Sequence, residues 1–349
     1  MRTFSIYTLG CKVNHYESAQ IRQFFEENGL KSVKNGQKPD FCVINTCCVT
    51  ATASAKSRQY IQRAKKSNPR AVKIVCGCLT SMKSDELRIP KDDAIHIISN
   101  RAELASKIKE ITGGASSENL TLLRNFKEQT RAFLKVQDGC DCNCSYCIIP
   151  KVRPDVQSKP PQDVIFEAKN LVAAGHKEIV VTGVNLGLYG REAGRNAECR
   201  TENTERRSKS GQQDIRTQGI RESGYQAECR TENAECRTQN GSCDSQPLLV
   251  LLGRLAEVEG LKRLRVSSLE PGDITGELLD VFSAHKNIMP HIHLSVQSGS
   301  DAILRRMCRP YTSAELREKI SLIKSRLDRP AITCDIIVGF PGETDEDFN

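Results

Sequence analysis

Short apolar runs alternate with amphipathic stretches over the first third of the chain. Strands are predicted where apolar residues are nearly continuous, at 4–10, 41–47, 71–78 and 94–100. The stretches between these runs have the apolar spacing of helices, as in 17–29, which is closed by Gly29. Buried strands that alternate with helices are typical of a parallel sheet covered on both faces. We therefore predict a small doubly wound α/β domain over residues 1–115.

The same alternation resumes after a polar stretch, 116–130, which we interpret as a linker. Repeated right-handed β/α units predict a (β/α) barrel over residues 131–349. These strands are too few to close a barrel, and the pattern breaks off where a helix should begin, so we expect a partial barrel, truncated at its C-terminus, with at least one further unit beyond Asn349. The predicted strands are 132–138, 178–185, 263–271, 291–298 and 331–340, and the helices include 161–174, 247–258, 274–284 and 313–327.

Residues 192–246 interrupt the barrel pattern with near-identical copies of the sequence AECRTEN. Apart from cysteines, the large apolar residues in this segment are Ile215, Ile220 and Tyr225. Such a segment cannot bury enough apolar surface to offset the entropy of ordering, so we predict a disordered insertion in a barrel loop. Duplication of the repeat explains the cysteines in this segment more simply than metal binding does.

Composition narrows the class of protein. The sequence has no run of 18 apolar residues and no secretory signal at its start, so we expect neither a membrane span nor export. Sixteen cysteines in a chain without an export signal favour metal or redox chemistry in a reducing compartment, the cytoplasm. The formal net charge of +8 is compatible with a nucleic-acid partner but does not by itself indicate one.

A dense group of cysteines follows the first predicted barrel strand, in the stretch DGCDCNCSYCIIP. Barrel enzymes place their active sites at this end of the strands. Cys140, Cys144 and Cys147 could bind three irons of a 4Fe–4S cluster, which leaves one iron open to a small ligand such as S-adenosylmethionine. On this interpretation Cys142 lies within the wrapping loop and is not a ligand. The alternative is a closed zinc site that uses all four thiols.

A second set of cysteines lies at strand ends in the first domain. Cys11 follows one predicted strand, and Cys47 and Cys78 end two others. The carboxyl ends of parallel strands meet at one edge of a sheet, where open α/β folds bind ligands. We therefore predict a second 4Fe–4S cluster that is again one protein ligand short. Cys48 and Cys76 are neighbours that could substitute, and three inert buried cysteines are the alternative.

Polar residues also end the other predicted barrel strands, where they could contact a cofactor or substrate. A glycine such as Gly183 would let a cofactor approach the backbone closely. Ordinary turn chemistry accounts for such residues equally well. Arg305, Arg306 and Arg309 could contact phosphate or form a solvated helix face. The candidate cofactor-binding residues are Gly183, Asn185, Ser268, Glu270, Gln297 and Ser298; we assign no catalytic acid, base or nucleophile.

The stretch CDCNCSYCIIP resembles the radical-SAM signature, with Tyr146 in the aromatic position before the last cysteine. From YTLGCKVNHYES to VGFPGETDEDF, apart from the insertion, the chain is similar to the methylthiotransferase branch of that superfamily. The resemblance implies two 4Fe–4S clusters, S-adenosylmethionine as methyl donor and radical source, and an electron donor such as flavodoxin or ferredoxin. The chain departs from this family at KVRPDVQSKPP, where relatives are rich in Arg, Gly and Ser, and at Ser295, where proline is expected. From the same resemblance we expect the chain to lack the RNA-binding domain that usually follows in this family.

The wording LGCKVN around Cys11 most resembles the subgroup that adds a methylthio group to C2 of N6-threonylcarbamoyladenosine 37 of tRNA. The resemblance thus implies that the partner is the tRNA anticodon loop, whose unpaired bases can be splayed into a pocket. Enzymes acting on isopentenyladenosine 37 or on ribosomal protein S12 are alternatives within the family. A non-catalytic iron–sulfur, RNA-binding fragment is an alternative of another class.

Overall fold

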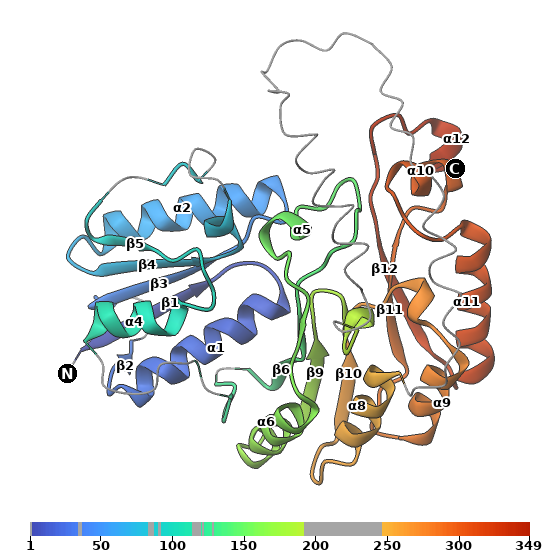
Figure 1. The fold of residues 1–349 in the computed structure, drawn as a ribbon, viewed down its shortest axis with the longest axis horizontal. Coiled ribbons are helices and arrows are strands. Elements are labelled where there is room, and N and C mark those ends of the chain that lie inside the picture. The colour runs from blue at the N-terminus through green and yellow to red at the C-terminus, as the bar shows by residue number, and fades with distance from the viewer. Residues whose placement is uncertain are drawn as a thin grey trace.

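The computed structural model describes residues 2–33, 37–82, 87–89, 92–113, 120, 122–127, 129–191 and 246–349. Two α/β units lie side by side, one built on a five-stranded sheet and the other on an arc of strands with helices outside it (Figure 1). The insertion predicted at 192–246 lies outside the described residues except for Gln246. In the part of the chain that the structure describes, no helix is long and apolar enough to cross a bilayer.

The first sheet has the strand order β2-β1-β3-β4-β5, and every neighbouring pair is parallel. This confirms the doubly wound sheet expected from the apolar runs. The pattern did not reveal β2, which has only two residues, both exposed. The strands are β1 Thr3–Thr8, β2 Lys31–Ser32, β3 Phe41–Thr46, β4 Val72–Gly77 and β5 Ile95–Ile97.

Helices cover both faces of this sheet, as Figure 1 shows. Helices α1 (Lys12–Glu27) and α4 (Leu104–Thr112) lie on one face and α2 (Ala51–Ser67) on the other. On the first face Phe4 of β1 stacks on Phe25 of α1, with 4.7 Å between the ring centroids. Residues of β3, β4 and α2 form the second apolar layer. The strand ends are thereby held in fixed positions at the edge of a packed core.

The second unit is an arc of parallel strands. Strands β6 (Arg131–Lys135), β9 (Glu178–Thr182) and β10 (Arg263–Val266) form one sheet, and β11 (His291–Gln297) pairs with β12 (Ala331–Ile336). Parallel bridges from Leu264 to Ile288 and from Leu269 to Leu294 join the two sheets. The outer helices are α6 Pro161–Ala173, α8 Pro247–Ala256, α9 Gly276–Ala284 and α11 Ser313–Arg326; the shorter helices α10 Asp301–Arg306 and α12 Asp345–Phe348 follow β11 and β12. The predicted partial (β/α) barrel is confirmed.

Several strands end earlier than their apolar runs suggested. The run at 178–185 becomes a strand only to Thr182, and the run at 331–340 only to Ile336. Gly183 follows β9 directly. After β12 the backbone N–H of Ile337 still donates to Gln297 over 2.8 Å, and the chain reaches a positive φ of +74° at Gly339. Most residues proposed for the site therefore lie on loops at the carboxyl ends of the strands, whereas Gln297 is the last residue of β11.

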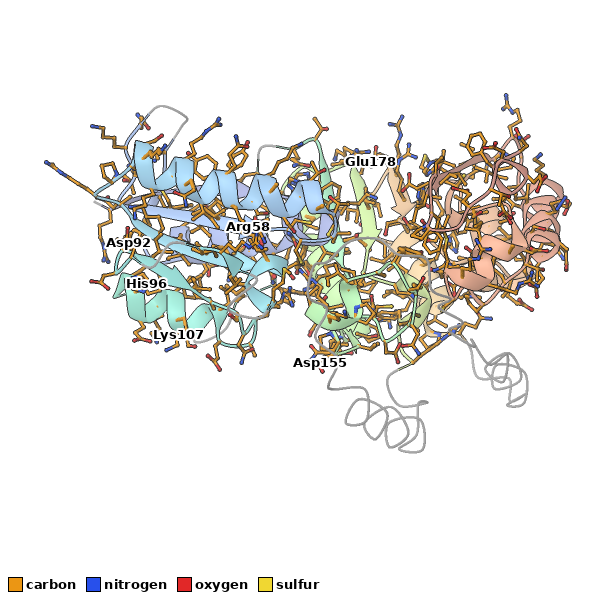
Figure 2. All side chains as sticks on the ribbon, turned by 90° about the horizontal axis from the view of Figure 1, so that it is seen from above. Arg58, Asp92, His96, Lys107, Asp155 and Glu178 are labelled. Atoms are coloured by element: carbon orange, nitrogen blue, oxygen red, sulfur yellow. The ribbon has the colours of Figure 1, made fainter. Side chains whose placement is uncertain are left out.

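Side chains of both units fill the boundary between them (Figure 2). Tyr16 of α1 is fully buried in the barrel's core, and its hydroxyl donates to Glu167 of α6 over 2.7 Å. Leu123 and Phe126, which lie within the predicted linker, are buried in the same core. The position of one set of strand ends is thus coupled by packing to the position of the other.

Candidate metal centres

The loop that carries Cys140 to Cys147 is closed at its base. Strands β7 (Gln137–Asp138) and β8 (Gln157–Ser158) pair antiparallel, and the backbone N–H of Cys140 donates to the carbonyl of Arg153 over 3.0 Å. Gly139, at a φ of +77°, lets the two sides of the loop approach, because a Cβ there would lie 1.9 Å from a backbone oxygen. A short helix, α5 (Ile149–Val152), leads out of the cysteine motif. The loop therefore begins and ends in fixed backbone.

The three cysteines of the proposed radical-SAM set are neighbours in this loop. Cys140 is buried, and Cys144 and Cys147 are half-buried. The backbone N–H of Cys147 donates to the carbonyl of Cys144 over 3.1 Å. Burial raises the pKa of the Cys147 thiol, and charge on Cys144 or Cys140 would raise it further. The thiols are therefore close enough to influence one another's ionisation.

Cys142, which we predict is not a ligand, lies beside Cys140. A hydrogen bond from the Cys142 thiol is the main cause that lowers the pKa of Cys140, to about 6. The same bond, followed by burial, raises the pKa of Cys142. The side-chain amide of Asn185 reaches both sulfurs, at 3.9 Å from Cys140 and 3.7 Å from Cys142. The side chain of Asn185 thus lies against the cysteine loop.

Gly183 packs closely against two neighbouring side chains. The space beside its Cα is filled by Gln137 and Leu186, each 2.9 Å from where a Cβ would stand. The side-chain oxygen of Gln137 also accepts the backbone N–H of Asn185 over 2.8 Å. In this structure the missing side chain makes room for a packed glutamine that supports Asn185.

Glu270 is held by an arginine that also contacts the cysteine loop. One nitrogen of Arg309 binds the Glu270 carboxylate, and another donates to the sulfur of Cys144 over 3.2 Å. Arg309 also donates to the carbonyl of Ser295, which accepts the hydroxyl of Tyr311 as well. The sequence suggested that Arg309 contacts phosphate or lies on a solvated helix face, but its side chain is turned inward and is 4% exposed. Burial lowers the pKa of Arg309, and the charge of Glu270 more than offsets this effect.

The remaining strand-end candidates differ in exposure. Ser268 is exposed after β10, whereas Ser298 is buried after β11 and its hydroxyl accepts the backbone N–H of Ser300. Gln297 has a φ of +67° at an irregularity in the pairing of β11 with β12. A non-glycine residue with positive φ is uncommon and marks a sharp change of chain direction. These residues lie at the carboxyl ends of β10 and β11, and the cysteine loop likewise follows the carboxyl end of its own strand, β6.

In the first domain, Gly10 brings the loop before Cys11 against Cys47. A Cβ on Gly10 would lie 2.7 Å from the Cβ and 2.9 Å from the sulfur of Cys47. Cys11 occupies the N-cap position of α1 and is exposed, while Cys47 and Cys78 are buried. Burial raises the pKa of Cys47, and Cys78 and Cys11 add to that rise. The three thiols are thus neighbours at the sheet edge predicted for them.

Cys48 and Cys76 have more apolar surroundings. Burial raises the pKa of each to about 12. Cys76 packs in the core between the sheet and α1, whereas Cys48 packs with Cys78, Leu79 and Val152 where the two domains meet. Cys76 therefore faces away from the proposed set, and Cys48 lies beside it.

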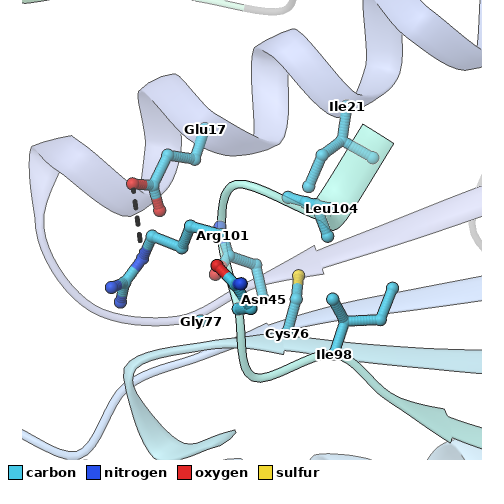
Figure 3. A pocket seen from close by; sticks show the side chains of 9 residues that line it. Glu17, Ile21, Asn45, Cys76, Gly77, Ile98, Arg101 and Leu104 are labelled. Carbon is cyan, nitrogen blue, oxygen red and sulfur yellow. Dashed lines mark ion pairs between the residues drawn. The ribbon is translucent and has the colours of Figure 1, made fainter. Parts of the chain in front are cut away.

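A buried ion-pair cluster, which sequence reasoning missed, lies between the two cysteine sets. It consists of Glu17 on α1, Lys135 on β6, Asp138 on β7 and Arg153 after α5, with 2.7 to 3.2 Å between the paired atoms. Arg101 approaches Glu17 at 3.9 Å from the edge of a small pocket (Figure 3). Two features of the sequence could have indicated this cluster. One is the acidic Glu17 on a helix with an apolar face, and the other is Arg153, which comes shortly after the cysteine motif.

Each set supplies three thiols, the donors that a 4Fe–4S cluster takes from a protein. Within the described ranges, no three Cys, His, Asp or Glu side chains are grouped to hold one ion. A cubane cluster instead binds each thiolate at a different iron, so its ligands need not converge on one point. Three neighbouring thiols at each set of strand ends fit that requirement.

Gly10→Ala tests the geometry of the first set. The substitution combines the strain of a φ of +100° with a clash against Cys47, so we expect the variant to lose cluster iron from the first domain after anaerobic reconstitution. Gly175→Ala is the matched control, because Gly175 has a φ of +102° but no atom within 4 Å of its added Cβ. Equal iron content in the two variants would contradict the proposed role of Gly10.

Comparison with known families gives two partial matches. Residues 3–98 match the uncharacterized protein family UPF0004, and residues 241–349 match the radical SAM superfamily. Solved structures show the same fold at low identity. The radical S-adenosylmethionine methyltransferase TsrM from Kitasatospora setae has a TM-score of 0.56 at 13% identity, covering 99% of this chain and 69% of that one. The cobalamin-dependent S-adenosylmethionine radical enzyme OxsB has a TM-score of 0.54 at 11% identity. This match covers 97% of the present chain and 49% of the OxsB chain.

Curated relatives match along the whole chain. Threonylcarbamoyladenosine tRNA methylthiotransferase MtaB from Bacillus subtilis (strain 168) is 35% identical over 100% of this chain and 69% of its own length. MtaB from Thermotoga maritima is 31% identical over 100% of this chain and 70% of its own length. A tRNA-2-methylthio-N(6)-dimethylallyladenosine synthase from Pelotomaculum thermopropionicum is also 31% identical, over 100% of this chain and 71% of its own length. The chain therefore belongs to the radical-SAM methylthiotransferase family, which uses S-adenosylmethionine and a 4Fe–4S cluster.

Proposed function

We propose that this chain is a tRNA methylthiotransferase that adds a methylthio group to C2 of N6-threonylcarbamoyladenosine 37. The observation that carries the proposal is the pair of cysteine sets, each at the carboxyl ends of parallel strands in its own domain. The resemblance of LGCKVN to one subgroup, together with relatives named for that substrate, supports this choice of base.

We further propose that Cys11, Cys47 and Cys78 hold one 4Fe–4S cluster and that Cys140, Cys144 and Cys147 hold the other. A reduced cluster held there with an open iron would supply the electron that cleaves S-adenosylmethionine into methionine and a 5′-deoxyadenosyl radical. We expect a flavodoxin or ferredoxin to deliver that electron, and the anticodon loop of tRNA to present the target base.

The surrounding residues have distinct proposed roles at the second set. Arg309, anchored by Glu270, fixes the side chain of Cys144 through its N–H···S contact of 3.2 Å. Asn185, supported by Gln137, positions Cys140. Ser268, Gln297 and Ser298 lie at neighbouring strand ends, where we expect them to contact S-adenosylmethionine. Gly183 acts indirectly, by admitting Gln137.

Mass spectrometry of digested tRNA tests the substrate. The reconstituted protein is incubated anaerobically with S-adenosylmethionine, a reductant and tRNA from cells that lack this modification. We expect a methylthio group on threonylcarbamoylated adenosine 37, and none with the Cys147→Ala variant. Methylthiolated isopentenyladenosine, which the relative from Pelotomaculum makes plausible, would overturn the substrate but not the family. Methylthiolation of ribosomal protein S12, when that protein is offered in place of tRNA, would do the same.

A further inference from the structure

We propose that Arg153 is a positioning residue that joins the two cysteine sets and sets the reduction potential of the first-domain cluster through its contact with Cys78. This inference rests on the proposed two-cluster arrangement. It is independent of which base is modified. The contacts of the guanidinium group and of the backbone of Arg153 support it.

Every N–H group of the Arg153 guanidinium has a partner, and the side chain is almost fully buried. Its Nε donates to the sulfur of Cys78 over 3.3 Å. One terminal nitrogen donates to Glu17 over 2.9 Å and to Asp138 over 2.7 Å. The other donates to Asn14 over 3.0 Å and to Glu17 over 2.9 Å. These contacts use the five donors that a guanidinium has.

The partners belong to the segments that carry both cysteine sets. Asn14 and Glu17 lie on α1, which begins directly after Cys11. Asp138 precedes Cys140 by two residues, and the carbonyl of Arg153 accepts the backbone N–H of Cys140 over 3.0 Å. A single residue therefore binds Cys78, the helix after Cys11 and the backbone at Cys140.

The charge of Arg153 is balanced within the protein rather than by water. Glu17 and Asp138 pair with it, and Lys135 supplies a second cation to the same two carboxylates. A planar guanidinium can satisfy this many fixed acceptors, whereas an ammonium group cannot reach them all. Because breaking such a buried cluster leaves uncompensated charge, the guanidinium is held rigidly against Cys78.

A fixed N–H donor beside a cluster sulfur stabilises added negative charge. Reduction makes a cluster more negative, and its potential depends on hydrogen bonds to the sulfurs and on nearby charge. The geometry thus predicts that Arg153 favours the reduced state of the cluster bound by Cys78. Arg101 donates to the same sulfur over 3.6 Å, so it should favour the reduced state as well.

A redox titration monitored by electron paramagnetic resonance tests the proposal. The parent protein carries Cys140→Ala, Cys144→Ala and Cys147→Ala, so that the first-domain cluster is observed alone. Adding Arg153→Met should lower the ratio of reduced to oxidised cluster about tenfold at a given potential, a shift of about 59 mV for one electron. Arg153→Lys should give a smaller shift in the same direction, because it keeps the charge but loses the directed N–H.

Lys135→Met is the matched control. It removes a cation from the same buried cluster, but Lys135 has no described contact with a cysteine sulfur. Its shift should be less than half that of Arg153→Met. Equal shifts in the two variants would overturn the proposal, as would a parent protein that binds no cluster. If Arg153→Met does not fold, an unchanged potential and spectrum in Arg153→Lys would overturn it. The measurement uses no tRNA, so an incorrect substrate assignment would not affect it.

Discussion

Replacing Cys140 and Cys144 with alanine is expected to remove about half of the iron and to abolish formation of 5′-deoxyadenosine. The reason is that both thiols belong to the proposed radical-SAM set, whose open iron would bind S-adenosylmethionine. The unmodified protein should contain about eight irons per chain, four for each cubane cluster. Iron and sulfide are measured after anaerobic purification, and 5′-deoxyadenosine after reduction with S-adenosylmethionine.

A matched substitution separates this effect from general loss of thiols. Cys334 is an exposed cysteine on β12, so Cys334→Ala should keep the full iron content and form 5′-deoxyadenosine. Zinc in place of iron in the anaerobically purified protein would contradict the prediction. Iron retained in full by the double variant would show that other residues ligate the cluster, with Cys142 the first candidate because it lies beside Cys140.

The second large effect is expected from Glu17→Gln, which should lower the free energy of unfolding by roughly 3–5 kcal/mol at neutral pH. Glu17 pairs with Arg153 at 2.9 Å and with Lys135 at 3.2 Å, and its side chain is only 9% exposed. The substitution keeps the size of the side chain but leaves these cations without one of their two carboxylates. Unfolding in urea measures the loss.

The pH dependence of this difference gives an independent check. The Arg153 and Lys135 charges outweigh burial and lower the pKa of Glu17 to about 2. A carboxylate whose pKa is depressed in the folded state stabilises the fold above its unfolded pKa, and this contribution is lost as the pH falls toward the folded value. The stability difference between the unmodified protein and Glu17→Gln should therefore shrink between about pH 4.5 and pH 2.

An exposed carboxylate serves as the control. Glu110 pairs with Lys107 at 3.1 Å near the end of α4, and the two side chains are 71% and 49% exposed. Water screens such a pair, so Glu110→Gln should change stability by about 1 kcal/mol or less. Figure 2 shows Lys107 at the lower edge of the first domain. A loss for Glu17→Gln no larger than that of the control would contradict a stabilising role for the buried cluster.

The sequence by itself determined the fold class and the two places where chemistry is concentrated. Apolar runs such as 41–47 and 71–78 predicted parallel strands because a strand buried on both faces leaves a nearly continuous apolar signature. Because these strands are parallel, their carboxyl ends lie at one edge of the sheet. Cys47 and Cys78 must therefore lie at the same edge as Cys11. Cys140, Cys144 and Cys147 lie within eight residues of one another, so their closeness follows from the sequence alone.

Only the tertiary structure decided what stands between the two cysteine sets. Arg153 is distant in sequence from Asn14, Glu17 and Cys78, and no local pattern specifies that the loop after β6 packs against α1. Arg309 turns inward for the same reason, since its acceptors, Glu270 and Cys144, come from other parts of the chain. Apolar periodicity records which residues leave water, but the partner of a buried charge depends on how separate elements are brought together.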